Sequence, residues 1–292
     1  GVHFALGGTG EIVRALVALL GEMGVEVRMN APVEEIEVAG GRASAVRIAG
    51  GERIAADVVV SNADPSFVYA RMIAPAHRRR HTDHAVARRR QSMSLFVAYF
   101  GSTRTFPEVA HHTIVLGERY RGLLDDVFTR RRLAPDASLY LHAPTRTDPS
   151  LAPPGHEGLY VLSPVPNTRA GVDWTRESEG YFARILEMLD RRVLPGITGT
   201  ATSPSFLTPR EFEHDLRSVD GAAFGLEPRL TQSAYFRYHN RSEDVAGLYF
   251  VGAGTHPGGG VPGVLCSAKV LERVVPRPAH PVPLPFPVAT AP

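Results

Sequence analysis

The segment that follows a hydrophobic stretch near the end of the chain is dense in glycine. Residues 248–251 read as a buried strand, Thr255 lies inside the turn, and Pro262 stands where a helix would begin. Backbone N–H groups and a positive helix end can bind an anionic or electron-rich ligand when no β-carbon blocks the approach. The pattern predicts ligand contact, with a tight strand-to-helix packing turn as the alternative. The glycines concerned are Gly252, Gly254, Gly258, Gly259, Gly260 and Gly263.

Three of these glycines, Gly258, Gly260 and Gly263, match the spacing G-x-G-x-x-G of dinucleotide-binding turns. The predicted strand ends well before Gly258, however, and prolines follow instead of a second strand bearing a carboxylate. The match is therefore not the fingerprint of a first βαβ unit, and no other segment of the chain supplies one. If the chain handles a dinucleotide, we expect the phosphate-binding half to lie outside it.

A group of histidines, His77, His81 and His84, has the spacing of metal ligands on one helical face. Arginines at positions 78–80 and 88–90 would repel a dication from this segment. We therefore predict no metal site here and expect a solvated basic helix face instead. Such a face can hold a protein against acidic lipids.

The elements that position these residues follow from hydrophobic periodicity. Helical spacing of apolar residues predicts an N-terminal helix that ends near Gly24, and a change to period two predicts a strand over residues 25–30. Residues 33–38 and 43–48 predict a hairpin, and 58–60 a buried strand. The inner face of the first helix is expected to carry Ile12, Leu16, Leu19, Leu20 and Met23.

The middle of the chain differs in amino-acid composition from the N-terminal part. Residues 66–92 are polar, rich in arginine and predicted to be helical. Seven prolines among the 17 residues from Pro276 onward predict a disordered or polyproline-like tail, 276–292. Further strands are expected at 93–101, 138–142 and 159–163, and helices at 181–193 and from the glycine turn to about Val275.

Composition narrows the class of protein. The 292 residues allow one large domain or two medium ones, and a net charge of +2 argues against a nucleic-acid binder. A single cysteine, Cys266, excludes an intramolecular disulfide and favours a cytoplasmic protein. We find no apolar run long enough to span a membrane, no signal peptide and no G-x-S-x-G motif.

Taken together, several short segments resemble the phytoene desaturases, the bacterial and fungal type of FAD-dependent carotenoid desaturase. The resemblance runs from Gly1 to about Arg273, and the motifs are specific only collectively. Cys266 departs from the glycine that the family usually has, and the proline-rich tail replaces a more ordinary helical end. The matching segments besides the glycine turn are 7–10, 61–64, 94–97, 111–114, 138–145, 147–153, 226–228 and 231–234.

The resemblance implies an α/β fold with α+β elements, in which an incomplete FAD-binding domain of the amine-oxidase-like type carries an inserted substrate domain. Residues 1–64 and 245–275 would belong to the FAD-binding domain, and residues 65–244 would form most of the substrate domain. The family's N-terminal FAD fingerprint has no counterpart here. The chain therefore resembles the C-terminal portion of a longer enzyme.

The cofactor implied by the resemblance is FAD, which would accept a hydride while a proton leaves the adjacent carbon of a polyene. The pyrophosphate or the ribityl chain would lie close to Gly252 and Gly254. Thr255, in the same turn between the last strand and the last helix, would also contact the cofactor. The ring edge would lie over the start of the last helix. The residues at that helix start are Pro262, Gly263 and Val264.

For other residues, the resemblance implies contact with the cofactor, and an ordinary structural role is the alternative. Val33, in a Pro-Val-x-x-Ile pattern, would pair its backbone with adenine, or it is an ordinary strand residue. Asn62 and Asp64 would touch the flavin or only cap a turn. No residue stands out as a catalytic acid or base. Four residues in family-like motifs could move a proton or stabilise a cation, although hydrogen bonding in loops is the favoured explanation: His142, Asp148, Glu227 and His256.

The leading hypothesis is thus a carotenoid desaturase portion that acts on phytoene or a close relative, a long apolar polyene. A carotenoid isomerase or another flavoprotein of the superfamily is the second hypothesis, and a non-catalytic fragment that binds apolar ligands is the third. We expect no nucleic-acid partner. A peripheral contact with the inner face of the cell membrane through the basic segment is the alternative to a face that is only solvated. The sequence indicates no oligomeric state.

Overall fold

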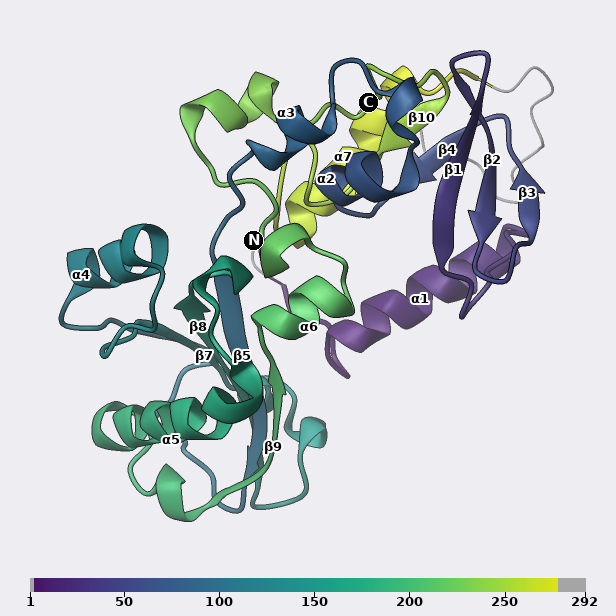
Figure 1. Ribbon diagram of the computed structural model, residues 1–292. Helices are drawn as coiled ribbons and strands as arrows, with labels where there is room; N and C mark the ends of the chain where they lie inside the picture. Colours follow the sequence, from purple (N-terminus) through teal and green to yellow (C-terminus); the bar gives the residue numbers. More distant parts are fainter. Residues whose placement is uncertain (1–2, 278–292) are drawn as a thin grey trace.

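Three sheets organise residues 3–277, the part of the chain that the computed structural model describes (Figure 1). A meander has the order β1-β2-β3, a pair joins β10 to β4, and a larger sheet has the order β6-β7-β8-β5-β9. The strands are β1 Val33–Ala39, β2 Arg42–Ile48, β3 Arg53–Ala55, β4 Val59–Ser61, β5 Ser94–Ser102, β6 His112–Val115, β7 Leu139–His142, β8 Glu157–Val165, β9 Ala201–Leu207 and β10 Leu248–Phe250. The helices are α1 Thr9–Glu22, α2 Pro65–Phe67, α3 Asp83–Ala87, α4 Tyr120–Leu124, α5 Trp174–Arg192, α6 Pro209–His214 and α7 Val261–Val274. The tail predicted at 276–292 lies almost entirely outside the described residues.

Helix α1 forms where its apolar spacing predicts it, but none of its residues is buried by the rest of the described chain. The five side chains expected to face inward are 36–46% exposed. The strand predicted over residues 25–30 is wrong, because this segment lies as coil outside the sheets of the described residues. An alternating pattern forms a strand only where a neighbouring strand offers hydrogen bonds. None of the described helices, α1 included, is long and apolar enough to cross a membrane.

The meander confirms the predicted hairpin between β1 and β2. Gly40 and Gly41 have φ angles of 58° and 77°, so both central residues of the two-residue turn are left-handed. Glycine adopts this conformation without strain, and such a turn matches the right-handed twist of the two strands. Ile36 and Ala43 point inward from the hairpin and are 2% and 1% exposed.

The pair formed by β4 and β10 is parallel. Leu248 lies opposite Val59, and Phe250 lies opposite Ser61. All three residues of β10 are buried, as expected for a short continuous apolar strand. Because parallel strands run in one direction, the two carboxyl ends meet at the same edge of the sheet.

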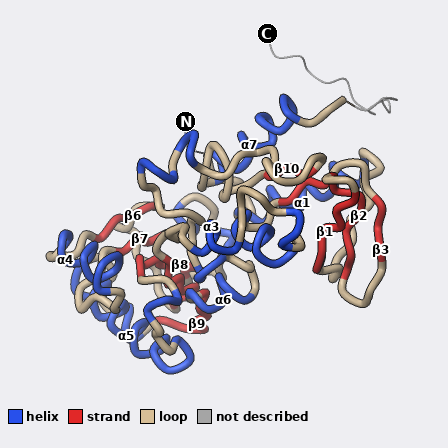
Figure 2. The backbone as a smooth tube through the Cα atoms, turned by 45° about the horizontal axis from the view of Figure 1, so that its top comes forward, coloured by secondary structure: helices blue, strands red, loops and turns tan. Residues whose placement is uncertain are grey.

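The five-stranded sheet forms a second unit around β5, which pairs antiparallel with β8 and β9. Helix α5 packs on one face of this sheet (Figure 2). The ring of Phe96 on β5 stacks on Trp174 at 5.4 Å and meets the edge of Tyr181 at 5.0 Å, and both partners belong to α5. Helix α5 begins seven residues earlier than predicted, at Trp174 after the capping Asp173.

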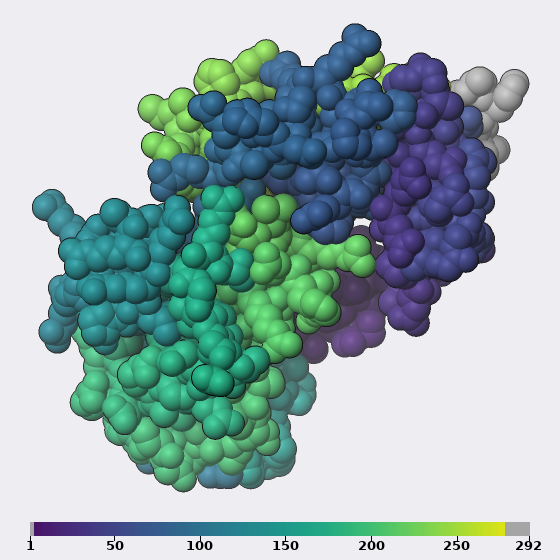
Figure 3. Space-filling model, viewed as in Figure 1, coloured from purple at the N-terminus to yellow at the C-terminus, as the bar shows by residue number. Residues whose placement is uncertain are grey.

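Two hydrophobic cores lie in the described residues. One contains buried side chains from Phe96 to Ile197 and fills the space between the five-stranded sheet and α5. The other joins Ile36 and Val59 to Val68 and Tyr69, and then to Phe250 on β10. Figure 3 shows the corresponding two lobes, with the meander at one end of the molecule and the five-stranded sheet at the other. Packing thus groups residues 68–86 with the lobe of the parallel pair, while the predicted domain boundaries stay a prediction.

The arginine-rich segment 66–92 is helical only in short pieces. Helix α2 continues as a π-helical turn over Val68–Met72, a 3-10 turn follows at Pro75–His77, and α3 covers Asp83–Ala87. The predicted single helix face with three histidines is therefore wrong. His81 is instead buried in the segment between the Pro75–His77 turn and α3. Its Nδ1 lies 2.8 Å from a carboxylate oxygen of Asp244, within hydrogen-bond distance.

Candidate functional site

The carboxyl ends of β4 and β10 bring two predicted site residues together. Asn62 follows β4 directly and Gly252 follows β10 by one residue, so the parallel register places them side by side. Ligands of sheets with parallel strands bind outside the carboxyl ends of those strands. A β-carbon added at Gly252 would overlap the side-chain oxygen of Asn62. The edge where the two strands end is therefore the candidate functional site.

A cavity of about 520 Å³ opens beside this edge, and we call it the strand-end cavity. Val33 at the start of β1 lines it together with Asn62, so the structure brings these two predicted residues to one space. The wall is mainly apolar, and only Asn62, Ser61 and Arg217 add polar side chains. Other lining residues are Ile36, Val46, Val59, Phe67 and Met72.

The first half of the glycine turn is tied down by protein contacts. Gly252 has a φ of +93°, and its N–H donates to Ser267 Oγ at 2.8 Å. A β-carbon at Gly254 would overlap the ring of Pro65. The packing-turn alternative therefore explains why these two positions need glycine. Their predicted approach to a pyrophosphate stays a prediction.

Thr255 is fully buried and its hydroxyl is used within the turn. Its Oγ accepts from Asn240 Nδ2 at 3.2 Å and donates to the carbonyl of Gly252 at 3.3 Å. Arg237 braces the same turn by donating to the carbonyls of Ala253 at 2.5 Å and Thr255 at 3.1 Å. Burial lowers the pKa of Arg237. The sequence reading missed Asn240 and Arg237, because no local pattern reveals long-range bonds to backbone.

The second half of the turn is open. β-Carbons placed at Gly258 or Gly260 would meet nothing within 4 Å, whereas one at Gly263 would lie 2.8 Å from the carbonyl oxygen of Gly258. Gly260 caps α7 without a side-chain hydrogen bond, and the exposed Pro262 occupies the first turn. The start of α7 therefore presents backbone N–H groups and a positive helix end without covering side chains. Such a helix start can stabilise an electron-rich group, and the predicted contact of Pro262, Gly263 and Val264 with a flavin ring stays a prediction.

Asp64 has a structural role at this edge. Its carboxylate caps α2 by accepting from the N–H of Ser66 at 2.8 Å and also accepts from the N–H of Val219 at 3.2 Å. Burial raises the pKa of Asp64, and these hydrogen bonds oppose the shift. The capping alternative therefore describes Asp64, whereas Asn62 is exposed toward the strand-end cavity.

A larger cavity of about 750 Å³ lies on the open face of the five-stranded sheet, and we call it the sheet-face cavity. Aromatic and aliphatic side chains dominate its wall, although His142 and Glu157 also contribute. Burial raises the pKa of the Tyr160 hydroxyl, which keeps this group neutral. Lining residues include Phe4, Tyr99, His142, Tyr160, Leu162 and Leu207.

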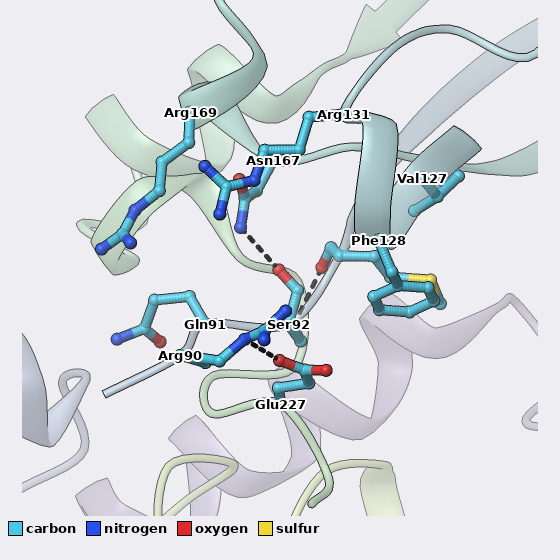
Figure 4. A pocket seen from close by; sticks show the side chains of 10 residues that line it. Arg90, Gln91, Ser92, Val127, Phe128, Arg131, Asn167, Arg169 and Glu227 are labelled. Atoms are coloured by element: carbon cyan, nitrogen blue, oxygen red, sulfur yellow. Dashed lines mark hydrogen bonds and ion pairs between the residues drawn. The ribbon is translucent and has the colours of Figure 1, made fainter. Parts of the chain in front are cut away.

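A third, small pocket lies between the two lobes (Figure 4). Its volume of about 30 Å³ is enough for a water molecule and too small for a cofactor. Arg131 and Arg169 lie on one side, and the Arg90–Glu227 ion pair at 2.8 Å lies on the other. Asn167 donates to the carbonyl of Ser92 at 3.0 Å across the pocket.

The four residues considered for proton transfer are not brought together. Glu227 is held by Arg90, and Asp148 accepts hydrogen bonds from the hydroxyl of Ser150 at 2.6 Å and the N–H of Gly7 at 2.6 Å. These bonds lower the pKa of Asp148. His256 is exposed at the glycine turn. Only His142 lines a large cavity.

His142 belongs to a cluster that the sequence reading did not assemble. His112 on β6 lies opposite His142 on β7, and His111 precedes His112. Nε2 of His111 lies 2.8 Å from Nε2 of His142. Burial and the neighbouring histidines lower the pKa of His142 to about 4. The pairing of β6 with β7 creates this cluster, and no local pattern in the sequence predicts that pairing.

The class of protein follows from this fold and from a family comparison. Residues 1–269 match the family described as flavin containing amine oxidoreductase, and the chain belongs to this family. Two solved structures share the fold: an oxidoreductase from Methanosarcina mazei, with a TM-score of 0.60 at 19% identity over 92% of this chain and 55% of that one, and a putrescine oxidase triple mutant, with a TM-score of 0.59 at 14% identity over 92% and 53%. The predicted amine-oxidase-like fold and the flavin cofactor FAD are thereby confirmed.

Within this family, the chain is similar to curated phytoene desaturases. It is 45% identical over 282 residues to the neurosporene-forming enzyme of Rhodobacter capsulatus, covering 94% of this chain and 54% of that protein. It is 47% identical over 278 residues to the lycopene-forming enzyme of Pseudescherichia vulneris, covering 94% and 56%. The predicted resemblance is confirmed, and the chain spans about half the length of these relatives.

Proposed function

We propose that this chain supplies the substrate-binding lobe and part of the flavin site of a phytoene desaturase. A bound FAD would supply the hydride acceptor for removal of hydrogen from adjacent carbons of the polyene. The observation that carries the proposal is the open, uncapped start of α7 at the carboxyl ends of β4 and β10. A helix start there stabilises negative charge through its free N–H groups and its dipole.

The strand-end cavity is the proposed entry for the rest of the cofactor. Val33 lies at the first position of β1 opposite Ile48, and because β1 is an edge strand among the described residues, the other side of its backbone can pair with adenine. Asn62 projects from the end of β4 toward the same cavity. The roles of Gly252, Gly254 and Thr255 are to fix the turn so that Pro262, Gly263 and Val264 lie under the ring edge.

The sheet-face cavity is the proposed polyene site. A hydrocarbon offers no hydrogen-bonding handle, so its binding depends on apolar area and on shape. Tyr99, Tyr160 and Leu162 supply such area from neighbouring strands of one sheet. The rest of the flavin site would come from residues outside this chain, and the uncovered apolar face of α1 offers a surface for them.

An apolar substrate resides in a bilayer, and we propose a peripheral contact with anionic lipid at the inner membrane face. Arg79, Arg80 and Arg88 are exposed, whereas Arg78 is buried and pairs with Asp83 at 2.7 Å. The basic surface is therefore smaller than the run of arginines indicates. Co-sedimentation with vesicles should depend on anionic lipid, and equal binding to neutral vesicles would refute this contact.

The activity is tested by restoring a full-length protein. The chain is fused to the part of the Rhodobacter capsulatus relative that it does not match, and the fusion is expressed in cells that accumulate phytoene. We expect coloured desaturation products by chromatography and about one FAD per purified fusion protein. The chain expressed alone should retain little FAD. A fusion that binds FAD stoichiometrically but leaves phytoene unchanged would overturn the proposed activity, and a chain that alone binds one tight FAD would overturn the proposal that the site is shared.

A further inference from the structure

Three imidazoles converge at the edge of the five-stranded sheet, away from the proposed flavin site. One ring nitrogen from each of His111, His112 and His142 lies within 4.8 Å of the other two. The rings of His112 and His142 are stacked with their centroids 5.2 Å apart, and the ring of Phe4 meets that of His111 edge to face with centroids 4.7 Å apart. We propose that these three histidines bind one divalent metal ion of the zinc class.

Hydrogen bonds from the outer nitrogens already orient two of the rings. Nδ1 of His111 lies 2.5 Å from the hydroxyl oxygen of Thr147, and Nδ1 of His112 lies 2.7 Å from that of Tyr140. Such bonds fix the direction of a metal-binding imidazole, and a hydroxyl oxygen can accept the N–H that leaves the other ring nitrogen free. In His111 and His112 the free nitrogen is then Nε2, and in His111 it faces Nε2 of His142 at 2.8 Å.

The separation of these two atoms is close to what an ion requires. Zn–N bonds of about 2.0–2.1 Å in a tetrahedral site hold two ligand nitrogens about 3.3 Å apart. Nε2 of His111 and Nε2 of His142 lie 2.8 Å apart, so the two rings have to separate by about 0.5 Å and turn until both lone pairs point at one ion. Without an ion, the contact between His111 and His142 is a single N–H···N hydrogen bond, in which His112 takes no part.

Packing holds the ring of His142 in place. Its Nδ1 is buried and has no partner among the described residues, so the ring is positioned by Phe4 and Tyr160 and by its Nε2 contact with His111. The charged neighbours that affect His111 and His142 are histidines alone, in contrast with the arginines around His81.

The donor set indicates the kind of metal. Three neutral imidazoles suit Zn²⁺, Co²⁺, Ni²⁺ or Cu²⁺ and do not suit Mg²⁺ or Ca²⁺, which prefer oxygen ligands. Three protein ligands leave one position of a tetrahedral site for water. Because His142 also lines the sheet-face cavity, the ion would lie at the rim of that cavity.

The test uses the untagged 292-residue chain, stripped of metal by a chelator, with Co²⁺ as a spectroscopic probe and Zn²⁺ as its competitor. We expect the visible absorption of four-coordinate Co²⁺ at one ion per chain, displaced by Zn²⁺. His111→Gln, His112→Gln and His142→Gln should each weaken Zn²⁺ binding at least about tenfold, and Thr147→Val should weaken it about tenfold by releasing the His111 ring.

His156→Gln is the matched control, because its exposed ring bonds only to the carbonyl of Pro154 at 3.1 Å. This variant should bind Zn²⁺ like the wild type. His112 is exposed, so its variant keeps the test valid even if loss of His142 prevents folding. The proposal fails if the wild type gives no four-coordinate Co²⁺ spectrum, or if the His112 variant binds Zn²⁺ as tightly as the His156 variant does.

Discussion

The side-chain oxygen of Asn62 occupies the space that a β-carbon on Gly252 would need. This contact joins the end of β4 to the turn after β10, and both residues were predicted from the sequence as cofactor contacts. Gly254 is restricted in a different way, because its missing β-carbon would overlap the ring of Pro65. An amide side chain can rotate away from such a contact, whereas a proline ring cannot.

These two contacts predict different costs for Gly252→Ala and Gly254→Ala. Gly252→Ala should lower the free energy of unfolding by about 2 kcal/mol, from the left-handed φ and the displacement of Asn62. Gly254→Ala should cost about 3 kcal/mol or more, because Pro65 cannot yield. Urea denaturation measures both.

Two further variants separate the causes. Gly50→Ala, at a φ of +91° with nothing within 4 Å, should cost only the strain of the backbone, about 1 kcal/mol. When Asn62→Ala is also present, the cost of Gly252→Ala in free energy of unfolding should fall to about 1 kcal/mol. The cost of Gly254→Ala should stay unchanged. Equal costs for all three glycine variants would contradict this account of the turn.

Asp244 predicts a pH dependence of stability. Burial opposes its ionisation, but the N–H groups of Arg80 and His81 outweigh burial and lower its pKa below the usual 3.8. A lowered pKa means that the carboxylate stabilises the fold above about pH 3.8 and that this contribution is lost as pH falls through the native pKa. Asp244→Asn should therefore cost about 2–3 kcal/mol at pH 7, and its difference from the wild type should shrink below pH 3.8.

Glu243→Gln is the control for Asp244→Asn. Glu243 is the next residue and pairs with His239 at 3.0 Å and with Arg80 and His81 at 3.8 Å, without backbone donors. Its variant should therefore lose less than about 1 kcal/mol at pH 7, well below the loss in Asp244→Asn. A difference between Asp244→Asn and the wild type that stays constant down to pH 3 would refute the role assigned to ionised Asp244.

The sequence predicted those elements whose signal is local. The β1–β2 hairpin depends on two adjacent glycines, and β10 depends on a continuous apolar run. The strands that were missed, β6 and β9, are the two edges of the five-stranded sheet. Every residue of β9 is exposed or partly exposed, and Ser203 has a φ of 51° beside a proline. Edge strands tolerate such residues because one side needs no partner, so period-two alternation is weak there.

The candidate site likewise has features that a local signal predicts and features that depend on tertiary contacts. The glycine turn was recognisable because conformational freedom and the absence of side chains are properties of single residues. The reason that a particular position requires glycine was not recognisable. Asn62 approaches Gly252, and Pro65 approaches Gly254, only after β4 and β10 pair. His112 and His142 are 30 positions apart and meet only through the register of β6 and β7. Contacts of this kind are set by tertiary pairing, which one sequence does not encode locally.

The core under the five-stranded sheet predicts a sharp contrast between two leucines. Leu139 on β7 is 1% exposed, and Leu116, just after β6, is 61% exposed. Leu139→Ala should lower the free energy of unfolding by about 3–5 kcal/mol, because it removes buried apolar surface and leaves a cavity. Leu116→Ala should change it by less than about 0.5 kcal/mol. Similar losses for both variants, measured by denaturant unfolding, would contradict the assigned burial.

The sheet-face cavity predicts a variant that separates substrate binding from flavin binding. Leu162 lines this cavity from β8, whereas the glycine turn follows β10, which belongs to a different sheet. A carboxylate at this position would have to lose its water when a hydrocarbon fills the cavity, which costs several kcal/mol. Leu162→Asp in the restored full-length protein should therefore lower desaturation of phytoene at least about tenfold, while the FAD content stays unchanged. Ile114→Asp, at a side chain that is 62% exposed on β6, is the control and should keep both properties. If Leu162→Asp desaturates phytoene at the wild-type rate, the polyene binds elsewhere.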